Sequence, residues 1–465
     1  MNKTIVFRMF PQESHHNATF KFASKLKGEG YRIVYASNEN MKAVIKENGF
    51  DFYLIEIKKD ILIKPLNRKI IQKTFKIKAL HFIKYFFGIG LVQSIRDIFI
   101  KRKYHIRQNR KILCNDYFKK LIEDLDPILL FLDGTYKYNA LHLIKYKLPF
   151  VIVETTVSLI RNNMKPPLNS GLIPVKNNWF SKTKVFFSWL YYDFKNNTSS
   201  LIIPNPKRTI INLSKKLSFP VSFLDFKRYY FFGFKNIIEI NTTIFEFDFP
   251  HIKMPYHFYV GPPKLIKRKD SVYDYLYHNC INKIKKDLKK IVYCSFGSMA
   301  WRYNKHELFL EKIIKSFINN KCFYLIICIE DENTRRILRN KYKYNHIYIF
   351  RKVPQIDLLL SGVDLMITHG GANSINECIL TSTPMLIYPG SKGLDQVGNA
   401  ARVVYHKLGL RGKYSDSIST ISKKTNTIVN NNHYLKNLNK FNRKINYQNY
   451  ITAKDFLMNV LNFKK

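Results

Sequence analysis

Cysteine is scarce in this sequence, and its six copies are scattered along 465 residues without a CxxC pair or the spacing of a zinc finger. Several of them lie inside apolar, strand-like runs, where cysteine behaves as a small hydrophobic side chain. These features exclude a small scaffold held together by disulfides and favour a reducing compartment, so we expect a cytoplasmic protein. The six positions are Cys114, Cys280, Cys294, Cys322, Cys328 and Cys378.

Long hydrophobic runs are also missing, since no stretch reaches the roughly 18 uncharged apolar residues that a membrane-spanning helix requires. The nearest candidate, Leu80–Ile95, contains Lys84 and leads into a strongly basic segment. Met1–Phe10 passes straight into a short apolar run without a basic region or a cleavage site, so we expect no signal peptide. Hydrophobic residues nevertheless make up 46% of the chain, which is enough for packed cores and argues against disorder.

Acidic residues are outnumbered, 33 against 78 Lys and Arg, which leaves a net charge of +45. The imbalance is concentrated in residues 58–111, which contain sixteen Lys or Arg but only Asp60 and Asp97 on the acidic side. Three explanations are open: the codon bias of an AT-rich genome, a solvated helical face, or a surface that binds an anionic membrane, where each cation near the headgroups adds about 1 kcal/mol. Because no RNP, helix-turn-helix or finger pattern is present, we expect no nucleic-acid partner.

Apolar, β-branched runs alternate with longer amphipathic stretches, which is typical of βαβ units and parallel sheets. The pattern occurs twice, on either side of Gly261–Pro263, where Gly and Pro interrupt regular structure. We therefore predict an α/β protein with two facing Rossmann-like domains and ligands bound in the cleft between the carboxyl ends of their sheets. The expected strands are Thr4–Phe10, Arg32–Ala36, Asp51–Ile57, Pro127–Leu132 and Phe150–Glu154, then Lys290–Ser295, Cys322–Ile329, His346–Phe350, Asp364–Thr368 and Pro384–Tyr388.

Domain boundaries are predicted from these strands and from shifts in composition. The N-terminal domain should occupy residues 1–255, followed by a linker over residues 256–290. The C-terminal domain should occupy residues 291–440, and a basic helix or tail should follow over residues 441–465.

The strongest motif for chemistry is His369-Gly-Gly-Ala-Asn-Ser374, which directly follows a predicted strand and opens a predicted helix. A glycine turn at this place lets backbone amides approach a ligand, and the partial positive charge of a helix start favours phosphate. Asn373 and Ser374 add donors, His369 can donate to a phosphate oxygen, and Glu377 lies one turn further on, where it can accept hydrogen bonds from a diol such as ribose. The alternative is an ordinary capped helix in a protein that binds no phosphate, since Ser and Asn cap many helices.

Together with Val353-Pro-Gln355 and Asp395-Gln396, this motif resembles the donor-binding signature of the family 1 glycosyltransferases, particularly their bacterial macrolide- and carotenoid-glycosylating branch. The resemblance implies the GT-B fold, an N-terminal acceptor-binding domain and a C-terminal donor-binding domain. It also implies that the donor is a nucleotide sugar, with UDP expected and TDP the alternative, because Lys352 stands where many plant members have Trp. The roles that it implies are uracil contact by Val353 and Gln355, diphosphate binding by Ser298, His369, Gly371, Asn373 and Ser374, ribose binding by Glu377, and sugar binding by Asp395 and Gln396.

A second motif, Phe10-Pro-Gln-Glu-Ser-His15-His16-Asn17, follows the first predicted strand. It resembles the loop of the same family in which a histidine is the general base, and position by position that histidine is His15, although His16 beside it leaves an alternative. An imidazole with a pKa near 6.5 is largely neutral at pH 7 and can accept a hydroxyl proton. Asp133, at the end of a predicted strand, matches the carboxylate that orients this base, although an aspartate before Gly134 could also simply form a turn.

These features together predict an inverting glycosyltransferase that moves a hexosyl group from a UDP-sugar to a hydroxyl of a hydrophobic small-molecule or lipid-like acceptor. We expect no metal or other cofactor, because the adjacent His15 and His16 are not part of a set of carboxylate or cysteine residues with the spacing of metal ligands. The alternative is a non-catalytic nucleotide- or nucleic-acid-binding protein on a degenerate scaffold of the same kind.

Overall fold

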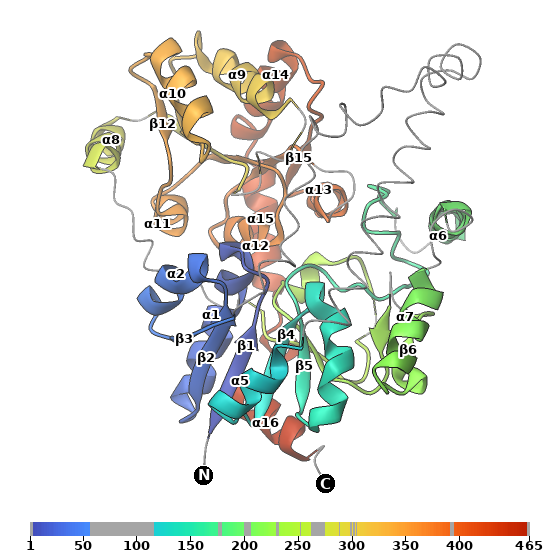
Figure 1. Ribbon diagram of the computed structural model, residues 1–465. Helices are drawn as coiled ribbons and strands as arrows, with labels where there is room; N and C mark the ends of the chain where they lie inside the picture. Colours follow the sequence, from blue (N-terminus) through green and yellow to red (C-terminus); the bar gives the residue numbers. More distant parts are fainter. Residues whose placement is uncertain are drawn as a thin grey trace, which may run out of the picture.

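The computed structural model of the chain contains two α/β domains, one above the other in Figure 1. The residues that it describes are 3–55, 116–174, 179–199, 206–228, 232–251, 253–261, 275–287, 289–297, 300, 303, 305–390 and 395–462. The basic stretch 58–111, which was predicted as a helical or lipid-binding surface, lies outside these residues, and so does Ser298.

The first domain is built on a sheet with the strand order β3-β2-β1-β4-β5-β8-β9. All neighbouring strands in it are parallel. β1 and β4 are buried along their whole length, which explains why their sequences are continuous apolar runs rather than alternating ones. The strands are β1 (Thr4–Arg8), β2 (Arg32–Ser37), β3 (Asp51–Leu54), β4 (Leu129–Asp133), β5 (Phe150–Glu154), β8 (Glu239–Asn241) and β9 (His257–Tyr259).

The second domain contains a parallel sheet with the order β12-β11-β10-β13-β14-β15. This is the doubly wound Rossmann order, in which successive strands are added on one side of β10 and then, from β13 onward, on its other side. In the first sheet, the strand order reverses in the same way between β1 and β4. The strands are β10 (Lys290–Ser295), β11 (Phe323–Cys328), β12 (Ile347–Phe350), β13 (Leu365–Thr368), β14 (Met385–Ile387) and β15 (Gly409–Arg411).

Helices cover both sheets, as buried parallel strands require. Among the described residues, those of the first domain are α1 (Glu13–Gly28), α2 (Lys42–Glu47), α5 (Phe118–Leu125), the 3₁₀ segment η3 (Gly134–Tyr146), α6 (Trp179–Ser199) and α7 (Pro206–Lys216). Those that follow are α8 (Tyr275–Lys286), α9 (His306–Phe317), α10 (Glu332–Lys341), α11 (Gln355–Leu360), α12 (Ala372–Leu380), α13 (Gln396–Tyr405), α14 (Ile418–Val429), α15 (His433–Lys444) and α16 (Ala453–Asn462).

The C-terminal segment returns to the first domain. Helix α16, drawn in red at the bottom of Figure 1, lies beside the strands of the first sheet. Its Phe456 is fully buried, with ring centroids 5.4 Å from Phe22 and 5.7 Å from Phe131. The last predicted segment is therefore an integral part of the first domain's core.

The ten predicted strands are all present, with ends that differ by up to three residues. The sequence analysis missed β8, β9 and β15, which have three residues each, and the separate antiparallel pair β6 (Leu224–Asp225) and β7 (Gly233–Phe234). Strands this short carry too few side chains to form a recognisable pattern. As a result, β9 belongs to the first sheet although it falls inside the stretch predicted as a linker. In the described part of the chain, no helix is long and apolar enough to cross a membrane.

Candidate active site

His15 and Asp133 lie close together at the point where the strand order of the first sheet reverses, between β1 and β4. Helix α1 begins at Glu13, so His15 lies in its first turn rather than in the loop that we had predicted. Asp133 is the last residue of the neighbouring strand β4. Their side chains are in contact, with His15 Nδ1 2.7 Å from Asp133 Oδ2. The two residues, 118 positions apart in the chain, are therefore brought together by strand order alone.

Asp133 is held rigidly by its surroundings. Only 1% of its side chain is exposed, and Oδ1 accepts hydrogen bonds from the Thr135 backbone N at 2.9 Å and from Thr135 Oγ1 at 2.7 Å. Burial alone would raise the pKa of this carboxyl, but the charge of His15 and these hydrogen bonds hold it below its usual value. Asp133 therefore stays ionised and orients the imidazole.

The pKa of His15 is raised, because the charge of Asp133 outweighs the effect of burial, which acts in the opposite direction. When neutral, His15 donates its Nδ1 proton to Asp133 and presents Nε2 as the acceptor. The Thr155 hydroxyl, just after β5, lies 3.2 Å from the same Nδ1. This is the geometry of a general base with its orienting carboxylate.

His16 has a different environment from His15. Its side chain is fully buried beside Tyr35, and its Nδ1 donates to the Gln12 carbonyl at 2.9 Å. Burial lowers its pKa to about 4. Of the two adjacent histidines, it is thus His15 that the structure brings to Asp133.

The His369 turn joins β13 to α12 in the second domain. Gly370 has a φ of +88°, a conformation that favours glycine. A Cβ on Gly371 would lie 2.6 Å from His369 Nε2, and one on Gly297 would lie 3.0 Å from His369 Cε1. Both glycines are therefore needed to leave room for the imidazole at the start of α12.

His369 is electrically neutral in this position. Burial lowers its pKa to about 4, and no carboxylate is among the causes of the shift. A neutral imidazole can donate one hydrogen bond to a phosphate oxygen but adds no positive charge. At the predicted diphosphate site, the groups that can attract an anion are therefore mainly the backbone amides at the start of α12.

The residues predicted to contact the uracil and the ribose of the donor are connected by hydrogen bonds. Gln355, at the start of α11, donates from Nε2 to Glu377 Oε2 at 2.5 Å and approaches Ser374 Oγ at 3.4 Å. The Tyr293 hydroxyl on β10 donates to Gln355 Oε1 at 3.1 Å. Val353, just before α11, is buried. Glu377 thus lies where its carboxylate is fixed by a neighbouring amide, one turn inside α12.

Asp395 and Gln396 lie at the start of α13, but their side chains are already engaged. Gln396 accepts from the Gly390 backbone N at 2.9 Å and donates to the Tyr303 hydroxyl at 2.7 Å. Asp395 Oδ2 accepts from Thr156 Oγ1 at 2.9 Å, across the domain boundary. Burial raises the pKa of Asp395, while its hydrogen bonds with Thr156 and Asn399 act in the opposite direction.

Three contacts join the two domains at the mouth of this site. Besides Thr156 and Asp395, Asn373 Nδ2 donates to the Ser14 carbonyl at 2.5 Å, one residue before His15. Lys352 Nζ lies 2.9 Å from Glu13 Oε2, and both side chains are partly exposed. The starts of α1 and α12, one in each domain, therefore lie close together.

A buried ion cluster fixes α13 further along its length. Asp248 of the first domain accepts from Arg402 Nε at 2.8 Å and Nη2 at 2.6 Å, and from Lys165 Nζ at 2.7 Å. All three side chains are almost completely buried. Burial of Asp248 is more than offset by Arg402 and Lys165, so its pKa is far below the usual value. This cluster attaches the helix that begins with Gln396 to the first domain.

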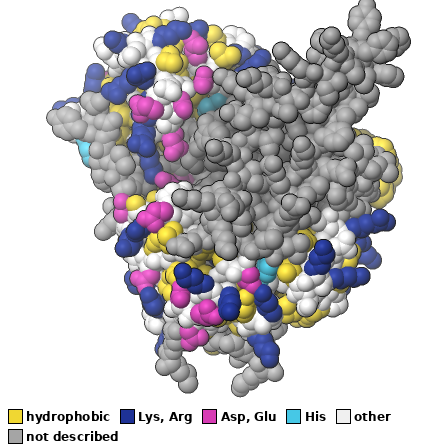
Figure 2. Space-filling model, viewed as in Figure 1, with side chains coloured by type: hydrophobic (Ala, Val, Ile, Leu, Met, Phe, Trp, Pro, Cys, Tyr) yellow, Lys and Arg dark blue, Asp and Glu magenta, His cyan; other side chains and the backbone are white. Residues whose placement is uncertain are grey.

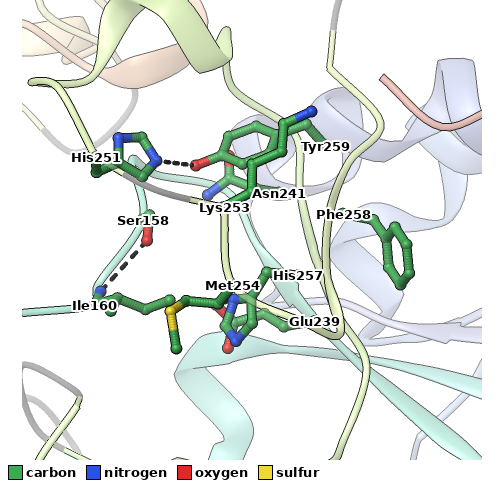
Figure 3. A pocket seen from close by; sticks show the side chains of 10 residues that line it. All are labelled: Ser158, Ile160, Glu239, Asn241, His251, Lys253, Met254, His257, Phe258 and Tyr259. Atoms are coloured by element: carbon green, nitrogen blue, oxygen red, sulfur yellow. Dashed lines mark hydrogen bonds and ion pairs between the residues drawn. The ribbon is translucent and has the colours of Figure 1, made fainter. Parts of the chain in front are cut away.

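A second buried cluster lies below the end of β5. Lys137 lies 2.5 Å from Glu154 and 3.6 Å from Glu239, so one cation serves two carboxylates, and burial raises the pKa of Glu154. Beside it, Figure 3 shows a small pocket in which His257 lies next to Glu239 and His251 contacts the Tyr259 hydroxyl at 3.1 Å. Its volume of about 10 Å³ is enough for roughly one water molecule and too small for a substrate.

The sequence analysis did not single out Thr155, Thr156, Tyr293 or Tyr303. A signal for the threonines was present, because they follow a predicted strand whose carboxyl end faces the cleft. No group of three or more His, Cys, Asp or Glu that could hold a metal occurs within the described ranges. The expected independence from metal remains a prediction.

Residues 301–451 match the family described as "Glycosyltransferase family 28 C-terminal domain". The zeaxanthin glucosyltransferase of Pantoea ananas is 20% identical over 429 residues, which cover 90% of this chain and 87% of that protein. The oleandomycin glycosyltransferase of Streptomyces antibioticus is 30% identical over 112 residues, or 24% of each chain.

Solved structures show the same fold over the whole chain. The calicheamicin glycosyltransferase CalG4 superimposes with a TM-score of 0.62, at 14% identity and with 99% of both chains covered. The spinosyn forosaminyltransferase SpnP gives a TM-score of 0.61 at 12% identity, covering 100% of this chain and 99% of the other. The predicted two-domain α/β architecture is thereby confirmed. The family match over residues 301–451 and the two glycosyltransferase relatives agree with the resemblance stated above, and they support the glycosyltransferase interpretation over the non-catalytic alternative.

Proposed function

We propose that this chain is a GT-B glycosyltransferase that moves a hexosyl group from a UDP-sugar to a hydroxyl of a hydrophobic acceptor with inversion at the anomeric carbon. The observation that carries the proposal is the His15–Asp133 pair at 2.7 Å, placed across the domain boundary from the His369 turn. One side of the cleft offers a base and the other offers a phosphate-binding helix start, which are the two requirements of glycosyl transfer without a metal.

In the proposed mechanism, His15 Nε2 removes the proton of the acceptor hydroxyl while Asp133 stabilises the imidazolium that forms. The acceptor oxygen attacks the anomeric carbon from the face opposite the diphosphate, so a new C–O bond forms as the bond to the leaving phosphate oxygen breaks. The negative charge then gathers on the diphosphate. The amides at the start of α12, together with His369 and Ser298, stabilise this charge.

Donor recognition is assigned to the connected group of Gln355, Ser374 and Glu377. Glu377 accepts hydrogen bonds from the ribose hydroxyls. Val353 and Gln355 contact the uracil, and Gly371 and Asn373 lie against the diphosphate. Asp395 and Gln396 bind sugar hydroxyls, while the hydrogen bonds that these side chains make to Thr156, Gly390 and Tyr303 persist and hold them in place. UDP is the proposed nucleotide and TDP the alternative, since a structurally similar enzyme, the spinosyn rhamnosyltransferase SpnG, is known with thymidine diphosphate.

The acceptor class is proposed from the relatives and from the composition of the first domain. Zeaxanthin, in the name of one relative, and the spinosyn aglycone, bound in one structural neighbour, point to a hydrophobic acceptor that carries a hydroxyl. Such an acceptor partitions into lipid, so we place the enzyme in the cytoplasm, at the inner face of an anionic membrane. No nucleic acid takes part in this proposal.

A donor and acceptor screen tests the proposed function. Purified protein is incubated with UDP-glucose, UDP-N-acetylglucosamine or TDP-glucose and a lipid extract, and glycosylated products are detected by mass spectrometry. We expect a product mass increased by one hexosyl unit that requires His15. A protein that binds UDP but yields no product, and no hydrolysis of any donor, would favour the binding-protein alternative.

A further inference from the structure

Helix α6 (Trp179–Ser199) presents an unusual outer face. Its exposed large hydrophobic side chains include Trp179, Tyr191 and Phe194, which are 78%, 68% and 66% exposed. The others are Phe180, Phe186, Phe187 and Leu190. An exposed apolar patch of this size on one element marks a binding surface rather than ordinary surface variation.

The inner face of α6 is firmly attached, so the outer face is not a result of poor packing. Asp193 binds Arg161 through two hydrogen bonds of 2.7 and 2.9 Å, and the Arg161 guanidinium lies 4.4 Å from the Trp189 ring. Trp189 Nε1 donates to the Lys165 carbonyl at 2.9 Å, and Val185 is buried. The polar and inward-facing groups hold the helix, and the aromatic rings point away from the protein.

The charges around this face have one sign. Lys182 and Lys184 are exposed on α6 between the aromatic residues, and the neighbouring segment α7 (Pro206–Lys216) adds exposed Lys207, Arg208, Lys215 and Lys216. The two helices contain a single acidic residue, Asp193, and it is bound to Arg161. Figure 2 shows hydrophobic side chains at the right-hand edge of the molecule, with Lys and Arg side chains below them.

We propose that α6 docks the protein onto an anionic membrane by inserting its aromatic outer face into the headgroup region. Trp, Phe, Tyr and Leu on one face of a helix, with Lys at its margins, are the composition that binds at a lipid interface. Lysines within the patch fit lipid phosphates, because their flexible stems carry the ammonium groups to the headgroups. In the centre of a protein interface, by contrast, the same lysines would lose their hydration, and charged residues are depleted there.

The position of α6 connects this surface to the site of transfer. The segment that leads from β5 to α6 begins with Thr155 and Thr156, which contact His15 and Asp395. The same segment contains Arg161 and Lys165, which hold α6 and the Asp248 cluster. The inference rests on the proposed function in one respect: a hydrophobic acceptor gives the enzyme a reason to lie on the bilayer from which that acceptor comes.

Vesicle sedimentation tests the inference directly. The full-length protein is mixed with vesicles of phosphatidylcholine alone, or of phosphatidylcholine with phosphatidylglycerol, at low and high salt. The test variant is Phe187→Ser/Leu190→Ser/Tyr191→Ser, and the matched control is Leu308→Ser/Ile337→Ser/Tyr447→Ser, whose three residues are exposed to a similar degree in other elements. Circular dichroism confirms that each variant is folded, and calorimetry with UDP in the absence of lipid reports on donor binding.

We expect the wild-type protein and the control to sediment with the anionic vesicles and to be released partly by salt. The α6 variant should bind these vesicles at least about tenfold more weakly, because it loses three apolar side chains that would be buried in the headgroup region on binding. Equal binding of the α6 variant and the control, or equal binding to both kinds of vesicle, would overturn the proposal. So would a change from dimer to monomer on mutation without any effect on lipid, which would make this face a contact between two copies. Because none of these readouts requires sugar transfer, failure of the proposed function would be seen separately, in the donor screen.

Discussion

The two domains place different chemistry at the same point of the same topology. Asp133 follows β4 and His369 follows β13, and these strands occupy corresponding positions beside β1 and β10. In the first domain this position carries an ionised carboxylate that raises the pKa of His15. In the second it carries a neutral histidine whose pKa is about 4, packed against two glycines. In the proposed function, the first of these positions supplies the residue that orients the base, and the second supplies the turn that binds the diphosphate.

The two domains share a fold and differ in charge at this position, so under the proposed function charge, and not fold, decides which half of the reaction each domain serves. A carboxylate beside the phosphate turn would repel a diphosphate, and a histidine without a carboxylate could not be held as an oriented base. The domains are held together at these points by Asn373–Ser14 and Thr156–Asp395. A substitution in the first domain should therefore affect proton removal from the acceptor, and one in the second domain should affect donor binding.

The largest effect should come from His15→Ala. We expect transfer to fall by about 10²–10⁴-fold, because general base catalysis is lost, while UDP binding is unchanged because His15 lies in the other domain. Initial rates and calorimetry with UDP measure the two quantities. His16→Ala is the control and should keep transfer, although loss of a buried ring lowers its melting temperature. If His16→Ala were the inactive variant with normal UDP binding, the roles of the two histidines would be reversed.

Asp133→Asn should remove the negative charge that raises the pKa of His15. Only unprotonated His15 can act as a base, so activity falls as the pH drops through its pKa, and the raised pKa places this loss at a higher pH than for an isolated imidazole. Removing the carboxylate charge lowers that pKa, so the acidic limb of the kcat/KM profile should move to lower pH. The maximal rate should drop roughly tenfold or more, since the ring loses its orientation. An acidic limb that does not move would show that Asp133 does not control His15.

Glu377→Ala should affect the donor half alone. The loss of a hydrogen-bonded carboxylate should weaken UDP binding by about 1.5–3 kcal/mol, and the fold should be retained. Calorimetry with UDP gives the affinity, and the pH profile of transfer serves as the internal control, because the pKa of His15 should stay the same. Unchanged UDP affinity would remove Glu377 from the ribose site.

Much of this architecture could be predicted from the sequence, because the central strands are continuous apolar runs. The His369 turn could be predicted too, because it is a compact motif between one strand and one helix. His15 and Asp133 could be paired only through the resemblance, since 118 residues separate them. The position of His15 in the first turn of α1 was missed, because the resemblance pointed to a loop after the first strand. Contacts between domains, such as Thr156 with Asp395, leave no trace in local spacing. Such contacts depend on how two independently folded sheets meet, which no single segment encodes.

The smallest effect, and the sharpest test of how the two halves are joined, should come from Thr156→Val. The substitution keeps the shape of the side chain but removes the hydroxyl that donates to Asp395 Oδ2 at 2.9 Å. The loss of one neutral donor to a buried carboxylate should cost about 1–2 kcal/mol in donor-sugar binding, seen as a higher KM for the UDP-sugar at nearly constant UDP affinity. Thr156→Ser should restore the wild-type KM, because it returns the hydroxyl. If Val and Ser behave alike, the hydrogen bond between the domains has no part in holding Asp395 ready for the sugar.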